Sequence, residues 1–188
     1  YLEIPYNAAL NTPKFTVSVW VYPTGGSGTL RSIFTSASAG SSNQKGYILY
    51  AHSSNKWQFV TGTGTGWNEV NSTTTITNND WTHVLGIYNG TTMRLYLNGI
   101  ENASLTCSTV QNVTRPLGIG YGNATAPNFY FPGRLYDFRY YNRAITETEI
   151  KKIVTTAELL GDEVITMPMS TVHPENLITR QKIYPSIF

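Results

Sequence analysis

The sequence is poor in cysteine and in charge, and both shortages narrow the classes of protein to which it can belong. Cys107 is the single cysteine among 188 residues, so it cannot form a disulfide within the chain, and zinc sites built from several cysteines are excluded. Only 13% of the residues are charged, about half the usual fraction. The net charge of +2 argues against nucleic-acid binding, which calls for a concentrated basic face.

A long apolar run and a targeting segment are also missing. The stretch 116–133 carries no charge, but its three prolines and four glycines predict loop and short strand, so we expect no membrane-spanning segment. The chain opens at Tyr1 with neither methionine nor an apolar leader, which predicts one piece of a larger protein. Low charge with abundant Thr, Asn, Gly and Tyr is typical of β-rich surface and secreted proteins. We therefore expect an extracellular, cell-surface or virion-surface location.

Alternation with a period of two residues dominates the first 145 positions and predicts β-structure. Phe15, Val17, Val19 and Val21 alternate with more polar neighbours, which is the pattern of a strand. Asn-Gly pairs at 89–90 and 98–99 predict tight hairpin turns. The stretches Ser36–Gly46 and Thr61–Gly66 are expected to be loops. Further strands are predicted over 47–50, 57–60, 73–77, 81–88, 92–97, 100–105 and 134–142.

The C-terminal part of the pattern predicts one helix and an appendage. Thr146 and Glu149 have the spacing of a capping box, which predicts a short helix near residues 146–154. The sequence therefore predicts an all-β protein, an antiparallel two-sheet jelly-roll sandwich over residues 1–155. Residues 156–188 are too few for a core of their own, so we interpret them as a linker or C-terminal arm that adds at most one edge strand.

Three stretches together resemble the laminin-G-like branch of the concanavalin A-like lectin/glucanase superfamily. They are Tyr1–Pro5 with Phe15–Pro23 (FTVSVWVYP), Trp81–Gly99 (WTHV through RLYLNG) and Gly133–Thr146 (GRLYDFRYYNRAIT) leading into the predicted helix. The resemblance implies two packed curved sheets, glycan or protein binding as an accessory module, and in many members a calcium ion. The resemblance is stronger evidence for the fold than for the function.

The acidic residues do not form the pattern of a glycosidase. Hydrolysis of a glycosidic bond usually needs two carboxylates that flank it, and in the glucanase relatives these come from alternate positions of one strand. No predicted strand here carries acids at that spacing, and the pair Glu147 and Glu149 is explained by the helix start. His52, His83 and His173 lie in no recognisable nucleophile signature. We therefore expect a protein without catalytic activity.

Two hypotheses of function follow from these observations. The first is a non-catalytic carbohydrate-binding or adhesion module. It would bind a glycan and would be joined to neighbouring domains in a larger chain. The alternative is a structural or protein-interaction domain that spaces or assembles its neighbours and binds a surface protein, without a glycan.

Aromatic residues in loops give the predicted glycan site. Trp67 and Asn68 follow the glycine run, and the segment Tyr121–Phe131 mixes rings with amides, so the two are expected to approach one another. Trp20 and Trp81 are expected in the core instead. The predicted glycan-binding residues are Trp67, Asn68, Tyr121, Asn123 and Tyr130.

Asp137 is the acidic residue of the third family motif, and the sequence leaves two roles open for it. It is a tentative ligand for calcium, which binds carboxylate and carbonyl oxygens. The alternative is an ion pair with a nearby arginine on the adjacent strand.

Overall fold

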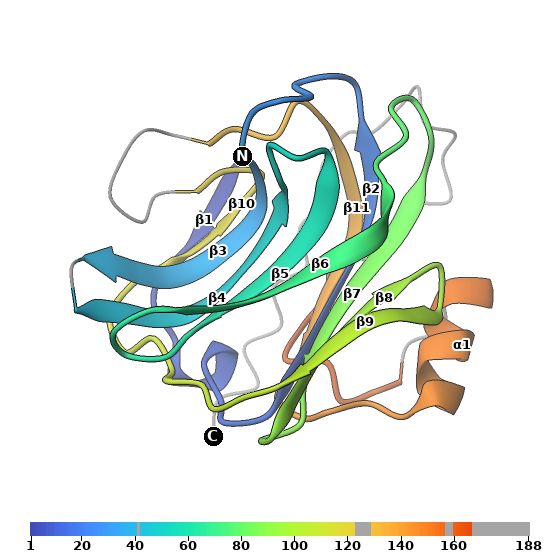
Figure 1. The fold of residues 1–188 in the computed structure, drawn as a ribbon. Helices are drawn as coiled ribbons and strands as arrows, with labels where there is room; N and C mark the ends of the chain where they lie inside the picture. The colour runs from blue at the N-terminus through green and yellow to red at the C-terminus, as the bar shows by residue number, and fades with distance from the viewer. Residues whose placement is uncertain (41, 123–128, 157–159, 167–188) are drawn as a thin grey trace.

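Two antiparallel sheets packed face to face make up the protein (Figure 1). The computed structural model describes residues 1–40, 42–122, 129–156 and 160–166. Sheet A has the order β1-β10-β3-β4-β5-β6, and sheet B has the order β12-β11-β2-β7-β8-β9. The prediction of a jelly-roll sandwich with one short helix is confirmed.

Sheet A is built from strands of the N-terminal half together with β10. Its members are β1 (Leu2–Ile4), β3 (Arg31–Gly40), β4 (Asn43–Ala51), β5 (Lys56–Gly62), β6 (Trp67–Thr75) and β10 (Leu117–Ile119). Sheet B consists of β2 (Phe15–Pro23), β7 (Thr82–Tyr88), β8 (Thr92–Leu97), β9 (Ile100–Thr106), β11 (Gly133–Tyr141) and β12 (Ile165–Thr166). A 3-10 turn, η1 (Ala8–Leu10), precedes β2.

The core lies between the sheets and is filled by alternate residues of each strand. Val17, Val19 and Val21 of β2 are fully buried, as the alternation predicts. Aromatic rings form the centre, where Phe15 stacks on Tyr140 at a centroid distance of 6.1 Å. Trp57 is 2% exposed and belongs to this core. The expectation that Trp20 and Trp81 are core is wrong, because both are half-buried and absent from the core cluster.

Helix α1 (Glu147–Thr155) covers part of the outer face of sheet B (Figure 1). Thr146 and Glu149 form the predicted capping box, each side chain bonding to the backbone N–H of the other residue. Ile150 and Ile153 pack into a second apolar cluster that includes Leu85, Ile87 and Tyr96. In the described ranges no helix lies on the outer face of sheet A, so that face is the more open side of the sandwich.

The segment that follows α1 returns to the sheet as far as it is described. Leu160 packs against the cluster under the helix, and Val164 packs against the main core. Val164 donates its backbone N–H to the Tyr140 carbonyl, and β12 then pairs with β11. In the described part of the chain, β12 is the edge strand of sheet B.

Gly86 on β7 provides a test of how tightly the two sheets pack. A Cβ atom at this position would lie 2.8–2.9 Å from three ring atoms of fully buried Phe59. We expect Gly86→Ala to lower the free energy of unfolding by about 1–3 kcal/mol, since the core must shift to accept the methyl group. Urea denaturation measures this change. Gly25→Ala is the control, because a Cβ there meets nothing within 4 Å, and a cost as large as that of Gly86→Ala would contradict the argument.

Candidate functional site

The open outer face of sheet A carries a patch of aromatic and polar side chains on β4, β5 and β6. Gln58 of β5 pairs with Tyr50 on one side and Asn71 on the other. The neighbouring row brings Glu69 beside Val60. Because side chains alternate between faces, and Leu49 and Phe59 point into the core, these residues point outward. We call the group Tyr50, Gln58, Trp67, Glu69 and Asn71 the sheet A platform.

The floor of the platform is apolar. Ala37, Ile48 and Val60 form a small buried cluster on this face, and half-buried Tyr50 and Trp67 pack against it. Each of the two rings therefore keeps part of its surface in contact with solvent. A half-exposed aromatic ring held by its own packing offers a preformed apolar surface to a ligand.

The polar side chains of the platform are partly connected to one another. The Gln58 amide donates to Glu69 Oε2 at 3.2 Å, and Gln58 is buried while Glu69 and Asn71 are exposed. Burial, and then the nearby charge of Glu69, raise the pKa of Tyr50 to about 12. The Tyr50 hydroxyl is thus protonated at neutral pH and available as a hydrogen-bond donor.

Phe129 extends the aromatic surface beyond Tyr50. The two rings meet edge to face at a centroid distance of 6.3 Å. The Phe129 carbonyl accepts a hydrogen bond from the Ser32 backbone N–H at 2.9 Å, which ties this segment to β3. Tyr130 follows and is 50% exposed. Its ring stacks on Tyr121 at 6.2 Å.

Tyr121 itself is largely shielded. It is 7% exposed, and its hydroxyl donates to Glu3 of β1. The ring of Tyr1 covers it at a centroid distance of 4.7 Å. A Cβ at Gly118 would lie 2.7 Å from the Tyr121 ring, so the glycine makes room for this packing. Tyr121 therefore belongs to an aromatic cluster that covers the β1–β10 edge of the sheet.

The predicted residues do not form the single rim that the sequence suggested. Trp67 lies in β6 and Tyr121 follows β10, and β5, β4 and β3 lie between those strands. Asn68 is directed away from Trp67, because neighbours in a strand face opposite sides. Its amide donates to the Ser108 carbonyl at 2.7 Å and to the Thr61 hydroxyl at 3.3 Å. Asn123 lies outside the described residues.

Sequence reasoning missed the members of the platform that lie between the predicted positions. Tyr50 and Gln58 were expected only as strand residues. A signal for them was present, because Tyr47 and Leu49 alternate with Ile48 and Tyr50, which predicts two covered faces. Which aromatic residue stays accessible depends on the pairing of distant strands, and the sequence alone did not give that pairing.

The Asp137 carboxylate is bound by an arginine, Arg139, which lies on the same strand, β11, and not on an adjacent strand as the sequence predicted. Asp137 lies at a β-bulge with a φ of 51° and is 4% exposed. Its two oxygens accept from Arg139 Nε at 2.9 Å and Nη2 at 2.7 Å. Glu163 lies beyond, at 3.8 Å from Arg139 Nη1. A guanidinium at this position does not fit a calcium shell, which needs six to eight oxygen ligands.

Metal and catalytic clusters are not evident among the described residues. None of their Asp, Glu, His and Cys side chains form a group of three that could hold a metal ion. His83 Nε2 and Ser18 Oγ are 2.8 Å apart, but both residues are 1% exposed, so a substrate cannot reach them. No helix among the residues searched is long and apolar enough to cross a membrane.

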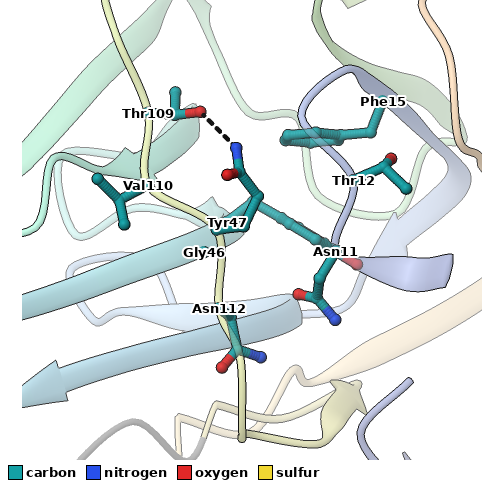
Figure 2. A pocket seen from close by; sticks show the side chains of 9 residues that line it. Asn11, Thr12, Phe15, Gly46, Tyr47, Thr109, Val110 and Asn112 are labelled. Carbon is teal, nitrogen blue, oxygen red and sulfur yellow. Dashed lines mark hydrogen bonds between the residues drawn. The ribbon is translucent and has the colours of Figure 1, made fainter. Parts of the chain in front are cut away.

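A shallow hollow at the rim of the sandwich is too small for an oligosaccharide. It lies between the segments 11–15 and 109–112, over Gly46 and Tyr47, and its free volume is only about 10 Å³ (Figure 2). Ligand pockets usually measure roughly 300–1,000 Å³. Its lining contains no Asp, Glu or His, and the Gln111 amide turns to the Thr109 hydroxyl at 3.4 Å. The hollow has neither the volume nor the groups of a catalytic pocket.

Comparison with known families identifies the class to which this sandwich belongs. The profile of the laminin G-like family described as the concanavalin A-like lectin/glucanases superfamily matches residues 1–151. The chain belongs to this family, so the resemblance seen in the sequence is confirmed. Comparison with curated proteins gives no match.

Solved structures with the same fold are distant in sequence. The binding domain of Paraclostridial Mosquitocidal Protein 1 has a TM-score of 0.65 and 16% identity, over 82% of this chain and 40% of that one. The CBM40 of the Ruminococcus gnavus IT-sialidase, bound to α2,3-sialyllactose, gives 0.62 and 11% over 78% and 85%. Domain 4 of the Geobacillus stearothermophilus arabinanase AbnA, in complex with arabinotriose, gives 0.59 and 19% over 77% and 68%. These likenesses show a shared fold.

Proposed function

We propose that this domain is a non-catalytic carbohydrate-binding module of a larger extracellular or surface protein, and that the sheet A platform binds the glycan. One observation carries the proposal: half-buried Trp67 and Tyr50 lie on the same open face as Gln58, Glu69 and Asn71. Aromatic rings cover the apolar faces of sugar rings, while amide and carboxylate groups hydrogen-bond to the hydroxyls. The platform combines both kinds of group.

The proposal is supported by what similar folds bind. The AbnA domain is in complex with arabinotriose, and the Ruminococcus gnavus module is bound to sialyllactose. An open, shallow surface buries little of its ligand, so we expect weak binding at a single site. Several copies on one larger assembly would raise the overall affinity through high effective concentration.

Trp67→Ala is expected to abolish glycan binding while the domain stays folded. The ring supplies the main apolar surface at the β6 end of the platform, and its removal also loses packing against the small buried cluster beneath it. That packing is partial, so we expect the free energy of unfolding to fall by only about 1–2 kcal/mol. A glycan array detects the binding, and thermal unfolding confirms that the variant is folded.

Trp81→Ala is the matched control for this substitution. Trp81 is also half-buried, but it packs against Tyr22 and Tyr136, whose strands belong to sheet B. We expect this variant to lose similar stability and to keep glycan binding. Loss of binding in Trp81→Ala alone would move the site to the other sheet. If the unchanged protein binds no glycan on the array, the protein-interaction hypothesis replaces this proposal.

A further inference from the structure

Glu69 gives the platform a negative charge on β6, the edge strand of sheet A. It lies on β6 between Trp67 and Asn71 at alternate positions of one strand, so all three side chains point to the same side. Glu69 is exposed, and Gln58 occupies only its Oε2 atom. The remaining oxygen and its lone pairs are therefore available to a ligand on this face.

Cations do not neutralise this carboxylate in the described part of the chain. The ion pairs found there join Arg94 to Glu101, Arg139 to Asp137 and Glu163, and Arg143 to Glu149 and Asp162. None of them includes Glu69. By strand alternation Lys56 also faces outward, but it lies two residues before Gln58 and pairs with Thr75, whereas Glu69 pairs with Val60. At the opposite edge of the sheet, Glu3 adds a second carboxylate.

We infer that Glu69 sets the ligand class of the platform, which binds neutral oligosaccharides and rejects those that carry carboxylate or sulfate groups. This inference rests on the proposed function. A carboxylate accepts hydrogen bonds from sugar hydroxyls, and such charge-assisted bonds are stronger than neutral ones. The same carboxylate repels an anionic sugar that is held against Trp67, which is a like-charge contact that discriminates between ligands.

The neutral ligand class inferred here differs from the ligand of one protein with a similar fold. The Ruminococcus gnavus module is bound to a sialylated, and hence anionic, trisaccharide. Likeness of fold alone would extend that preference to this chain. The charge at Glu69 opposes it, so the neutral ligand class comes from the side chains of the platform and not from the comparison.

The test is a binding series with matched neutral and anionic probes. The neutral probes are maltohexaose, cellohexaose, mannohexaose and arabinohexaose, and the anionic probes are hexagalacturonic acid and α2,3-sialyllactose. Calorimetry measures their affinity for the unchanged protein and for Glu69→Gln, which keeps the side-chain shape and removes the charge. We expect binding to at least one neutral probe and to neither anionic probe. Glu69→Gln should weaken the neutral ligand about tenfold, because a charge-assisted bond becomes a neutral one.

The substitution should also let the anionic probes bind measurably, which a merely structural role for Glu69 would not produce. Glu101→Gln on β9 is the control, since this acid lies in sheet B and pairs with Arg94, and it should change neither affinity. If an anionic probe binds the unchanged protein as tightly as any neutral one, the inference is overturned while the proposed function stands. Unchanged neutral affinity with continued anionic rejection in Glu69→Gln overturns it too. Failure of every probe and of the glycan array removes the proposed function and the inference together.

Discussion

Asp137→Asn should destabilise the domain by about 3 kcal/mol, because it leaves the buried Arg139 guanidinium without its bidentate carboxylate partner. The two side chains are 1% and 3% exposed, so water cannot take over the lost contacts. Asparagine keeps the volume of the side chain and tolerates the φ of 51° at this bulge. The substitution therefore tests the charge and not the backbone. A chain of this length should melt about 10 °C lower.

A second substitution separates the ion pair from other effects. Adding Arg139→Met to Asp137→Asn removes the buried charge, and an apolar side chain of similar length can replace a buried ion pair at little cost. Glu163 keeps partners in that background, because it also accepts from Tyr141 Oη and from the backbone N–H groups of residues 160 and 161. We expect the double variant to be more stable than Asp137→Asn alone. A double variant that is less stable would show that Arg139 contributes mainly through other contacts.

The same variant decides the role of calcium at this position. Since both oxygens of Asp137 are bound by Arg139, we expect the melting temperature of the unchanged protein to be equal in calcium and in chelator. A ligand that binds only the folded state would raise it. A calcium-dependent rise that disappears in Asp137→Asn would make the carboxylate a metal ligand after all.

The parts of the fold that the sequence predicts well are those in which local pattern and burial agree. The alternation of Phe15, Val17, Val19 and Val21 specifies both the strand and its buried face. The helix follows from Thr146 and Glu149, whose hydrogen bonds involve only neighbours in the chain. Asn98-Gly99 forms a tight turn, in which both residues have positive φ. In each case the stabilising contacts lie within a few residues of one another.

The strands of sheet A were harder to predict, because their residues are small or polar. Ser36–Gly46 was expected to be a loop, yet β3 runs to Gly40 and pairs with β4 from Asn43 onward. Close approach of backbones explains the composition there, since a Cβ at Gly46 would lie 1.9 Å from the Ser36 carbonyl oxygen. Strand propensity depends strongly on such context.

The platform depends on the pairing of distant strands, and only Trp67 among its members was a predicted site residue. Trp67 was correctly singled out as an aromatic residue outside the core, but it was placed in a loop. Trp67 instead begins β6, which pairs with β5. The residues of β6 are mostly polar and show no hydrophobic period, so no local pattern predicted a strand at Trp67. Trp20 could have been placed correctly from its own strand, since Val19 and Val21 point inward and Trp20 must then point outward.

The free energy of unfolding should fall by about 2 kcal/mol as the pH is lowered from 6.5 to 5, because His83 is held neutral in the folded protein. His83 is 1% exposed, and its Nδ1 atom has no hydrogen-bond partner. Burial, and then the charge of Arg139, lower the pKa of His83 to about 3. In the unfolded chain a histidine titrates near 6.5.

The sign of the effect follows from proton uptake. Between pH 6.5 and about 3 the unfolded chain binds a proton at His83 and the folded protein does not, so acid favours unfolding. The stabilisation is complete above pH 6.5 and is lost as the pH falls toward 3. Each pH unit in that range changes the free energy of unfolding by about 1.4 kcal/mol. The upper part of the range is the informative one, because most carboxylates stay ionised there in both states.

His83→Gln should remove most of this slope between pH 6.5 and 5. Glutamine stays neutral in both states, and its amide can still bond to Ser18 Oγ, which His83 Nε2 contacts at 2.8 Å. The variant is expected to lose stability at neutral pH, so the slopes of urea unfolding energies against pH are compared and not their absolute values. The half-exposed His52, in contact with Ser54 near the β4–β5 turn, provides the matched control, and His52→Gln should leave the slope unchanged. If His83→Gln keeps the full slope, the acid sensitivity arises from other groups, and His83 accepts its proton without cost to the fold.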